Sequence, residues 1–212
     1  MPKNLTSVIE FLNEHHRAFF ALEPYATETG HTTPSDTKSA SEVLISLLTG
    51  IRGRDRQKGS DFEDGSDVKA ANVWEAIDTP RFNGCAPAGR LSATSRKEEN
   101  LSAFADIPYL FFVLWDYAGK GHRCRVWVVR TQHDTEFRNV VSEWYEKRMS
   151  GEIKSTNFQL HPPRNKNDNV IRNSCGNLSY PLLFRADNTG EGYRVVTHDE
   201  DTLKRGMCTK AP

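Results

Sequence analysis

Two residues that could act together on a phosphate stand within one short segment, residues 59–72 (GSDFEDGSDVKAAN). Asp67 and Lys69 are two positions apart, so in a β-strand both side chains would project from the same face. Val68 between them would then point to the core, which suits an apolar side chain. The spacing therefore predicts a carboxylate and an ammonium group directed at one point.

A second carboxylate precedes this pair. Asp61 lies six positions before Asp67, and Asp64-Gly65 between them is a strong turn sequence. A tight turn there would bring Asp61 back beside Asp67. Asp55 and Asp64 are the alternatives for this first acid.

Such a set of residues suits the hydrolysis of phosphodiesters. Two carboxylates that face one point bind a hard divalent cation, typically Mg²⁺ with Mn²⁺ as a substitute. A neighbouring lysine orients water and stabilises the charge that develops on a phosphate, while the metal acts as a Lewis acid. A charged, glycine-rich segment is also typical of a solvated surface loop, but the combination of two acids, a turn and a lysine favours catalysis.

These residues resemble the PD-(D/E)xK nuclease motif, in which an acid begins one strand and a (D/E)-x-K triplet ends the next. The close spacing of the two acids is similar to that of the mismatch-repair nicking endonuclease and its restriction-enzyme relatives. The segments VWEAIDTPRFNGC, PYLFFVLWDY and RCRVWVVRT further resemble type II restriction endonucleases. The chain departs from the motif because Ser60, not proline, precedes the first acid, and because the gap to Asp67 is short.

The resemblance implies several further properties. It implies an α/β fold with a mixed central sheet flanked by helices, the PD-(D/E)xK core. It implies a sequence-specific, Mg²⁺-dependent cut in double-stranded DNA with 5′-phosphate products, a homodimer on a palindromic site, and a partner DNA methyltransferase. It also implies Glu42 as an additional catalytic glutamate on a helix before the motif. An exposed glutamate near a helix start, which interacts favourably with the helix dipole, is the alternative for Glu42.

Two basic segments are candidates for DNA contacts. In the first, which lies just before Asp61, every second residue is basic: Arg52, Arg54, Arg56 and Lys58. In an extended chain these side chains would line a phosphate track, although a solvated basic loop offset by Asp55 explains them equally well. The second is the polar stretch from Lys154 to Arg172, which we expect to be a loop that reads bases. Its candidate residues are Arg164, Asn165, Lys166, Asn167, Asn169, Arg172 and Asn173.

The surrounding pattern predicts the elements that position these residues. Helical spacing predicts helices over residues 7–22 and 39–48 and after Asp134, with a possible capping box from Ser7 and Glu10. Two aromatic and β-branched runs, residues 108–117 and 123–131, predict a central antiparallel hairpin. The last sixty residues are rich in turns, with short strands over residues 180–185 and 193–197. Trp115, Trp127 and Trp144 lie within apolar patterns and are expected in the core.

Length and composition limit the choice of class. The 212 residues suit a single domain, residues 1–212. The 28 basic and 28 acidic residues cancel, which argues against a nonspecific polybasic binder but fits a nuclease that needs both signs. The four cysteines form no CxxC pair, so we expect scattered thiols rather than a zinc site. With no apolar run to span a membrane and no signal-peptide core, the expected location is the cytoplasm.

Other functions remain open at this point. A DNA-binding domain with a nuclease-like but inactive site would keep the basic segments. A nicking or repair nuclease, or a hydrolase of RNA or of a small molecule, would use the same metal-binding acids.

Overall fold

The structure is a computed structural model of the 212-residue chain. It describes residues 4–21, 24, 37–54, 59–74, 79–86, 101–163 and 168–212. In these ranges the helices are α1 (Leu5–Phe20), α3 (Thr37–Thr49), α5 (Thr135–Met149), α6 (Thr202–Arg205) and the 3-10 helix η1 (Ala103–Asp106). The strands are β1 (Asp67–Asn72), β2 (Tyr109–Ala118), β3 (Gly121–Arg130), β4 (Val170–Asn173), β5 (Gly176–Ser179), β6 (Leu182–Asn188), β7 (Tyr193–His198) and β8 (Thr209–Lys210).

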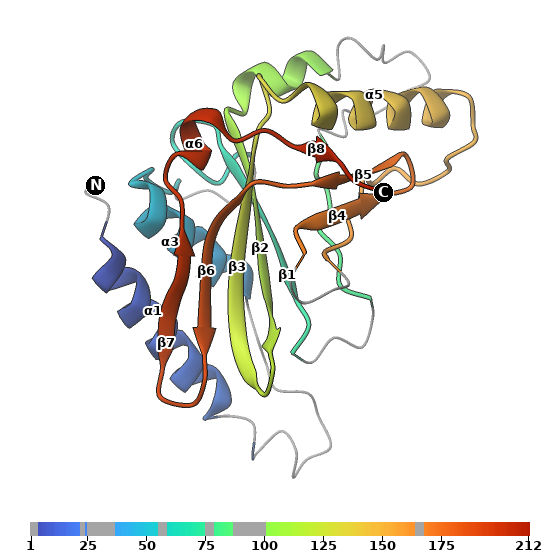
Figure 1. The fold of residues 1–212 in the computed structure, drawn as a ribbon. Coiled ribbons are helices and arrows are strands. Elements are labelled where there is room, and N and C mark those ends of the chain that lie inside the picture. The colour runs from blue at the N-terminus through green and yellow to red at the C-terminus, as the bar shows by residue number, and fades with distance from the viewer. Residues whose placement is uncertain are drawn as a thin grey trace.

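A five-stranded mixed sheet in the order β1-β2-β3-β6-β7 forms the centre of the molecule (Figure 1). β1 pairs with β2 in parallel, and every other neighbouring pair in this sheet is antiparallel. The hairpin of β2 and β3 lies inside the sheet rather than at its edge, as the aromatic and β-branched runs predicted. The α/β class and the mixed sheet with flanking helices are therefore confirmed.

A second sheet, in the order β4-β5-β8, was not predicted. The turn-rich composition of the last sixty residues indicated irregular structure, and that expectation was partly wrong. These strands have only four, four and two residues, which is too short for a two-residue hydrophobic period to be recognised. The expected strands over residues 180–185 and 193–197 are found as β6 and β7, with shifted ends for β6.

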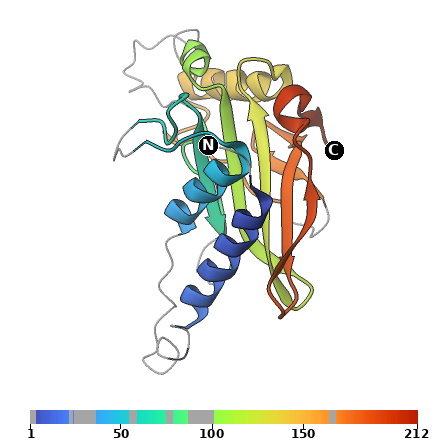
Figure 2. The same ribbon diagram turned by 90° about the vertical axis from the view of Figure 1, so that its left-hand side faces the viewer.

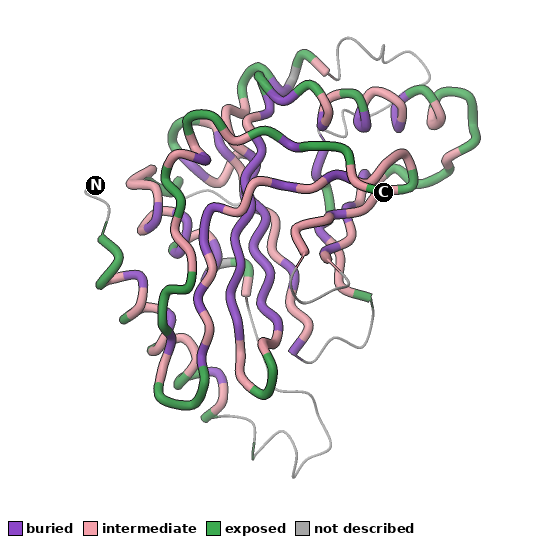
Figure 3. The backbone as a smooth tube through the Cα atoms, in the orientation of Figure 1, coloured by how far each residue is buried: buried purple, intermediate pink, exposed green. Residues whose placement is uncertain are grey.

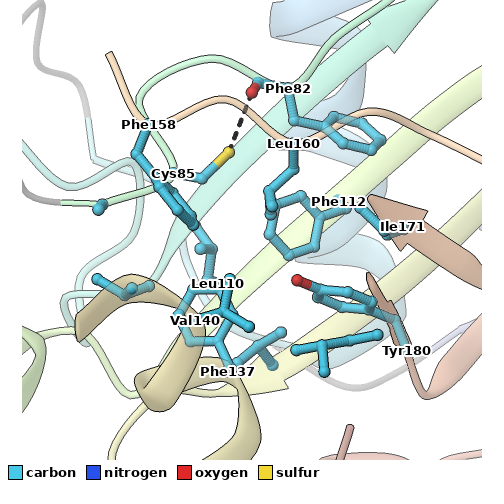
Figure 4. Close-up of a cluster of buried hydrophobic side chains, with 14 of the residues drawn as sticks. Phe82, Cys85, Leu110, Phe112, Phe137, Val140, Phe158, Leu160, Ile171 and Tyr180 are labelled. Atoms are coloured by element: carbon cyan, nitrogen blue, oxygen red, sulfur yellow. Dashed lines mark hydrogen bonds between the residues drawn. The ribbon is translucent and has the colours of Figure 1, made fainter. Parts of the chain in front are cut away.

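The central strands β2 and β3 are buried on both faces of the sheet, whereas the edge strand β7 is largely exposed (Figure 3). Along β2, the side chains of Phe111, Val113 and Trp115 belong to one apolar cluster, which α1 and α3 cover. Figure 2 shows these two helices side by side on that face of the sheet. The alternating residues of β2 belong to a second cluster on the other face, with α5 and the small sheet (Figure 4). Burial on both faces explains why β2 is a nearly continuous apolar run.

The helix ends confirm one expectation and correct another. Asp134 is the N-cap of α5, because its Oδ1 accepts a hydrogen bond from the Phe137 amide at 3.0 Å. The proposed capping box of Ser7 and Glu10 was wrong. Instead Asn4 caps α1, with its Oδ1 accepting from the Ser7 amide at 3.2 Å, so the helix begins two residues earlier than predicted.

The tryptophans and cysteines lie as expected. Trp115, Trp127 and Trp144 are buried in the two clusters. All four cysteines are free thiols, of which Cys175 alone is partly exposed. Within the described ranges, no helix has both the length and the hydropathy needed to cross a bilayer.

Candidate active site

β1 carries Asp67 and Lys69 on one side and buries Val68 on the other. Val68 packs in the cluster under α3, as the alternation of the strand requires. The Lys69 ammonium forms an ion pair with Asp67 Oδ2, and both side chains are mostly covered. The predicted carboxylate–ammonium pair is therefore present, although the triplet begins β1 rather than ending a strand as in the PD-(D/E)xK pattern.

The tight turn before β1 is formed as predicted. The Gly65 amide donates to the Phe62 carbonyl at 3.1 Å, and the Phe62 amide donates to the Ser66 carbonyl at 3.2 Å. Gly65 has φ of 95°, and a Cβ atom there would collide with the Asp106 carbonyl oxygen, so only glycine fits. Asp64 accepts from the Ser66 amide at 2.8 Å and from its hydroxyl at 2.9 Å, which fixes the turn.

This turn places Asp61 beside Asp67. Asp61 Oδ2 accepts a hydrogen bond from the Val68 amide at 3.0 Å, and Asp67 Oδ1 accepts from the same amide at 3.1 Å. The pKa of Asp67 is raised to about 7 by burial and by a hydrogen bond with the Asp61 carboxyl, while Lys69 opposes the shift. Two carboxyl groups crowded in this way favour either a shared proton or a cation between them.

The two carboxylate groups are suitable ligands for a hard divalent cation. Mg²⁺ binds oxygen ligands, keeps several of its waters and needs only one or two carboxylates from a protein. Asp61 and Asp67 supply two such groups. Elsewhere in the described ranges, as here, no group of three or more His, Cys, Asp or Glu side chains is arranged to hold a metal.

Glu42 and its neighbour Lys38 lie on the first turns of α3. Lys38 Nζ is 3.5 Å from Glu42 Oε1. Lys38 lines a depression of about 250 Å³ together with Lys69, Ala70, Asn83 and neighbouring residues, whereas Glu42 is not part of its lining. Of these two side chains, the structure thus brings Lys38 rather than Glu42 into the depression that contains Lys69.

The first basic segment lies directly against the turn. Gly53 and Phe62 form an antiparallel bridge, and the Arg54 amide donates to the Asp61 carbonyl at 2.8 Å. The Arg52 and Arg54 side chains are exposed, although Arg54 also donates to Ser60 Oγ and to the Glu63 carbonyl. Arg56, Lys58 and the rival acid Asp55 lie outside the described residues.

The second basic segment is not one continuous loop. Arg172 lies in β4, pairs through its backbone with His161, and donates from its guanidinium to the Pro162 carbonyl at 2.9 Å. The expectation of a single reading loop up to Arg172 was therefore wrong at its C-terminal end. Arg164, Asn165, Lys166 and Asn167 lie outside the described residues.

The sequence analysis missed Asn83, and it did not single out Asn157 and Gln159 within the polar stretch from Lys154 to Arg172. Asn83 lines the same depression as Lys69, and it contacts Asn157 and Gln159 through side-chain hydrogen bonds. The alternation of Asn157, Phe158, Gln159 and Leu160 is that of a half-buried strand and could have indicated their outward direction.

Comparison with known proteins identifies the family of the chain. Its residues 24–191 match the family model of the MamI restriction endonuclease. The chain is also 31% identical over 181 residues to the type II restriction enzyme MamI of Microbacterium ammoniaphilum, a match that covers 78% of this chain and 56% of that enzyme. No solved structure matches.

The similarity thus points to the class of type II restriction endonucleases. Within this class, the chain belongs to the MamI restriction endonuclease family. It spans little more than half the length of the MamI enzyme that it matches.

Proposed function

We propose that this protein is a divalent-metal-dependent endonuclease that hydrolyses phosphodiester bonds of double-stranded DNA at a specific sequence. Membership of a restriction endonuclease family supports the substrate and the specificity. The observation that carries the chemistry is the convergence of Asp61, Asp67 and Lys69 at the start of β1. We infer that residues 1–212 form a single nuclease domain with a PD-(D/E)xK-like core.

In this proposal Asp61 and Asp67 hold the cation, Mg²⁺ or Mn²⁺, which would supply Lewis-acid polarisation of the scissile phosphate. Lys69 holds the attacking water in line and stabilises the negative charge that develops on the phosphate oxygens. The water oxygen bonds to phosphorus as one proton of the water passes to solvent, and the bond from phosphorus to the 3′ oxygen breaks. The leaving 3′ oxygen takes up a proton from solvent, so the products are a 5′-phosphate and a 3′-hydroxyl.

The role of Glu42 follows from the family resemblance, and the roles of the basic residues follow from their charge and their position in the chain. Glu42 would act through Lys38, with which it is ion-paired, at the edge of the depression that contains Lys69. The exposed Arg52 and Arg54, with Arg56 and Lys58, would contact DNA phosphates beside the site. Arg164, Lys166 and Arg172 are further candidates for DNA contact. We also propose a homodimer on a palindromic site and a DNA methyltransferase of matching specificity.

The test is incubation of the purified protein with supercoiled plasmid and genomic DNA in Mg²⁺, followed by sequencing of the cut ends. The proposal predicts discrete fragments whose ends carry 5′-phosphates and share one sequence. A continuous smear would indicate a nonspecific nuclease. Binding without any cleavage in Mg²⁺ or Mn²⁺ would indicate a DNA-binding domain with an inactive site.

A further inference from the structure

Two extended segments lie side by side next to the candidate active site, and we call them the amide ribbon (residues 82–85 and 157–160). Three backbone hydrogen bonds join them. Phe82 and Leu160 exchange two, at 2.8 and 3.0 Å, and the Cys85 amide donates to the Phe158 carbonyl at 3.1 Å. The two segments are far apart in the sequence, so the fold, and not a local turn, brings them together.

The ribbon has an apolar inner face and a polar outer face. Phe82, Phe158 and Leu160 are buried in the cluster shown in Figure 4 and fix the ribbon to the central sheet. Asn83 is exposed, and Asn157 and Gln159 are partly exposed. These three amides are hydrogen-bonded to one another on the outer face.

The backbone fixes the direction of every amide in this group. The Gly84 N–H, which can only donate, bonds to Asn157 Oδ1 at 2.7 Å. Asn157 must therefore present its Nδ2 to Asn83, whose Oδ1 accepts at 3.2 Å. The same Oδ1 accepts from Gln159 Nε2 at 3.0 Å. The orientation is thus set by a main-chain donor that cannot be reversed.

Specific hydrogen-bonding capacity is left over on the outer face. Toward the residues that the structure describes, Gln159 keeps its Oε1 as an acceptor and one Nε2 hydrogen as a donor, side by side. Asn83 keeps its Nδ2 as a donor. An adjacent acceptor and donor on one amide match the N6 amino group and the N7 atom that adenine presents in the major groove.

The ribbon is also in the right place to meet DNA. Asn83 lines the depression that contains Lys69 and Lys38. A duplex with its phosphate at Lys69 would have its neighbouring base pairs close to this face, and a two-stranded ribbon is narrow enough to enter a major groove.

We propose that Gln159 reads an adenine base by a bidentate contact in the major groove beside the scissile phosphate, with Asn83 donating to an acceptor on the adjacent base pair. Asn157 is a positioning residue that orients both amides. This inference rests on the proposed function, because it places the scissile phosphate at Lys69. It makes the amide ribbon, and not the Arg172 end of the polar stretch, the reading element, since the Arg172 guanidinium already donates to the Pro162 carbonyl.

The test selects bound duplexes from a random-sequence library in Ca²⁺ buffer, so that the readout is base preference and does not require cleavage. The wild-type protein is compared with Gln159→Ala, Gln159→Glu and Asn83→Ala. The matched control is Asn139→Ala, an exposed amide on α5 that does not line the Lys69 depression. Thermal melting of each variant shows whether it folds.

We expect the wild type to select a site that contains adenine. Gln159→Ala should lose roughly ten-fold or more of the preference for one adenine position, while the other positions stay the same. Gln159→Glu offers only acceptors, so the preference at that position should move toward cytosine, whose N4 amino group donates. If the Gln159 amide were purely structural, its substitution would lower the melting temperature without changing a base preference in this way.

The inference is overturned if folded Gln159→Ala and Gln159→Glu select the wild-type sequence, or if the wild type selects no sequence at all. If Gln159→Ala does not fold, Gln159→Glu and Asn83→Ala decide the question by the same readout. Hydrolysis is measured in a separate assay, as cleavage of plasmid DNA in Mg²⁺. A protein that selects adenine through Gln159 but does not cut would refute the proposed catalysis and keep the inference.

Discussion

Asp61 and Asp67 share one backbone donor: the Val68 amide bonds to Asp61 Oδ2 at 3.0 Å and to Asp67 Oδ1 at 3.1 Å. The two carboxyl groups are thereby held next to each other at the start of β1. Burial, and then the hydrogen bond with Asp61, raise the pKa of Asp67 to about 7. In the proposed enzyme, the repulsion between these groups is the reason that the site takes up a cation.

The first prediction concerns that cation. Because the site offers oxygen ligands, cleavage of plasmid DNA should require Mg²⁺ or Mn²⁺, and EDTA should abolish it. Ca²⁺ should support DNA binding with little cleavage, because the larger ion accepts looser geometry and positions water poorly. Full activity in excess EDTA would contradict the assignment of the two aspartates.

The second prediction distinguishes the first acid from its neighbour in the turn. Asp61→Asn keeps an oxygen that can accept from the Val68 amide, so the turn should remain while the metal-binding charge is lost. We expect cleavage to be abolished, and DNA binding without metal to tighten, because a carboxylate that repels phosphate is gone. A plasmid assay in Mg²⁺ measures the cleavage, and titration of a DNA duplex in EDTA measures the binding without metal.

Asp64→Asn is the matched control for this experiment. Asp64 accepts from the Ser66 amide and hydroxyl and belongs to the turn itself. Its substitution should lower the melting temperature slightly and leave the cleavage rate near that of the wild type. The reverse pattern, with Asp64→Asn inactive and Asp61→Asn active, would show that the first acid was wrongly chosen.

Contacts between residues close in the sequence could be predicted at this site, and contacts between distant residues could not. Asp61, the Asp64-Gly65 turn and Asp67 to Lys69 lie within nine residues, so turn chemistry and strand alternation were sufficient to predict their proximity. The pairing of residues 82–85 with residues 157–160, which lie in the predicted polar stretch, was missed because Asn83 meets Gln159 only through the tertiary fold. Likewise, the two β2 faces were not assigned to particular helices, since an apolar run that is buried on both sides carries no periodicity.

The third prediction concerns the phosphate track. Arg52 and Arg54 are exposed beside Asp61. Replacing both by alanine should weaken binding to all duplexes evenly and reduce the slope of log K against log salt by about 0.9 for each phosphate that is no longer neutralised. Arg194→Ala, at the opposite edge of the sheet in β7, should leave the slope unchanged. An unaltered slope in the double variant would remove these arginines from the DNA interface.

The fourth prediction concerns the stability of the fold in acid. His122 packs among Phe20, Trp74 and Tyr117, and its Nδ1 is 3.0 Å from His16 Nε2. Burial and, to a lesser extent, His16 lower the pKa of His122 from 6.5 to about 4. Between these values the unfolded chain binds more protons than the folded one, so stability should fall as the pH drops from about 6.5 to about 4.

Urea unfolding midpoints across this pH range measure the effect. His122→Phe keeps an aromatic ring and removes the titrating group, so the acid-dependent loss should become smaller. His133→Phe, at an exposed position after β3, is the control and should leave the pH dependence as it is in the wild type. An identical pH dependence in the wild type and His122→Phe would exclude His122 as the source.

The proposed enzyme needs Lys69 for catalysis beside the two acids, and the single-turnover rate of plasmid cleavage by Lys69→Ala in Mg²⁺ measures this need directly. The substitution leaves both carboxylates in place and removes the group that orients water and stabilises the developing charge. We expect a rate loss of ~10²-fold or more with nearly unchanged DNA affinity. Lys120→Ala, in the exposed turn between β2 and β3, should cut at the wild-type rate. A folded Lys69→Ala protein that binds and cuts DNA as fast as the wild type would contradict the account.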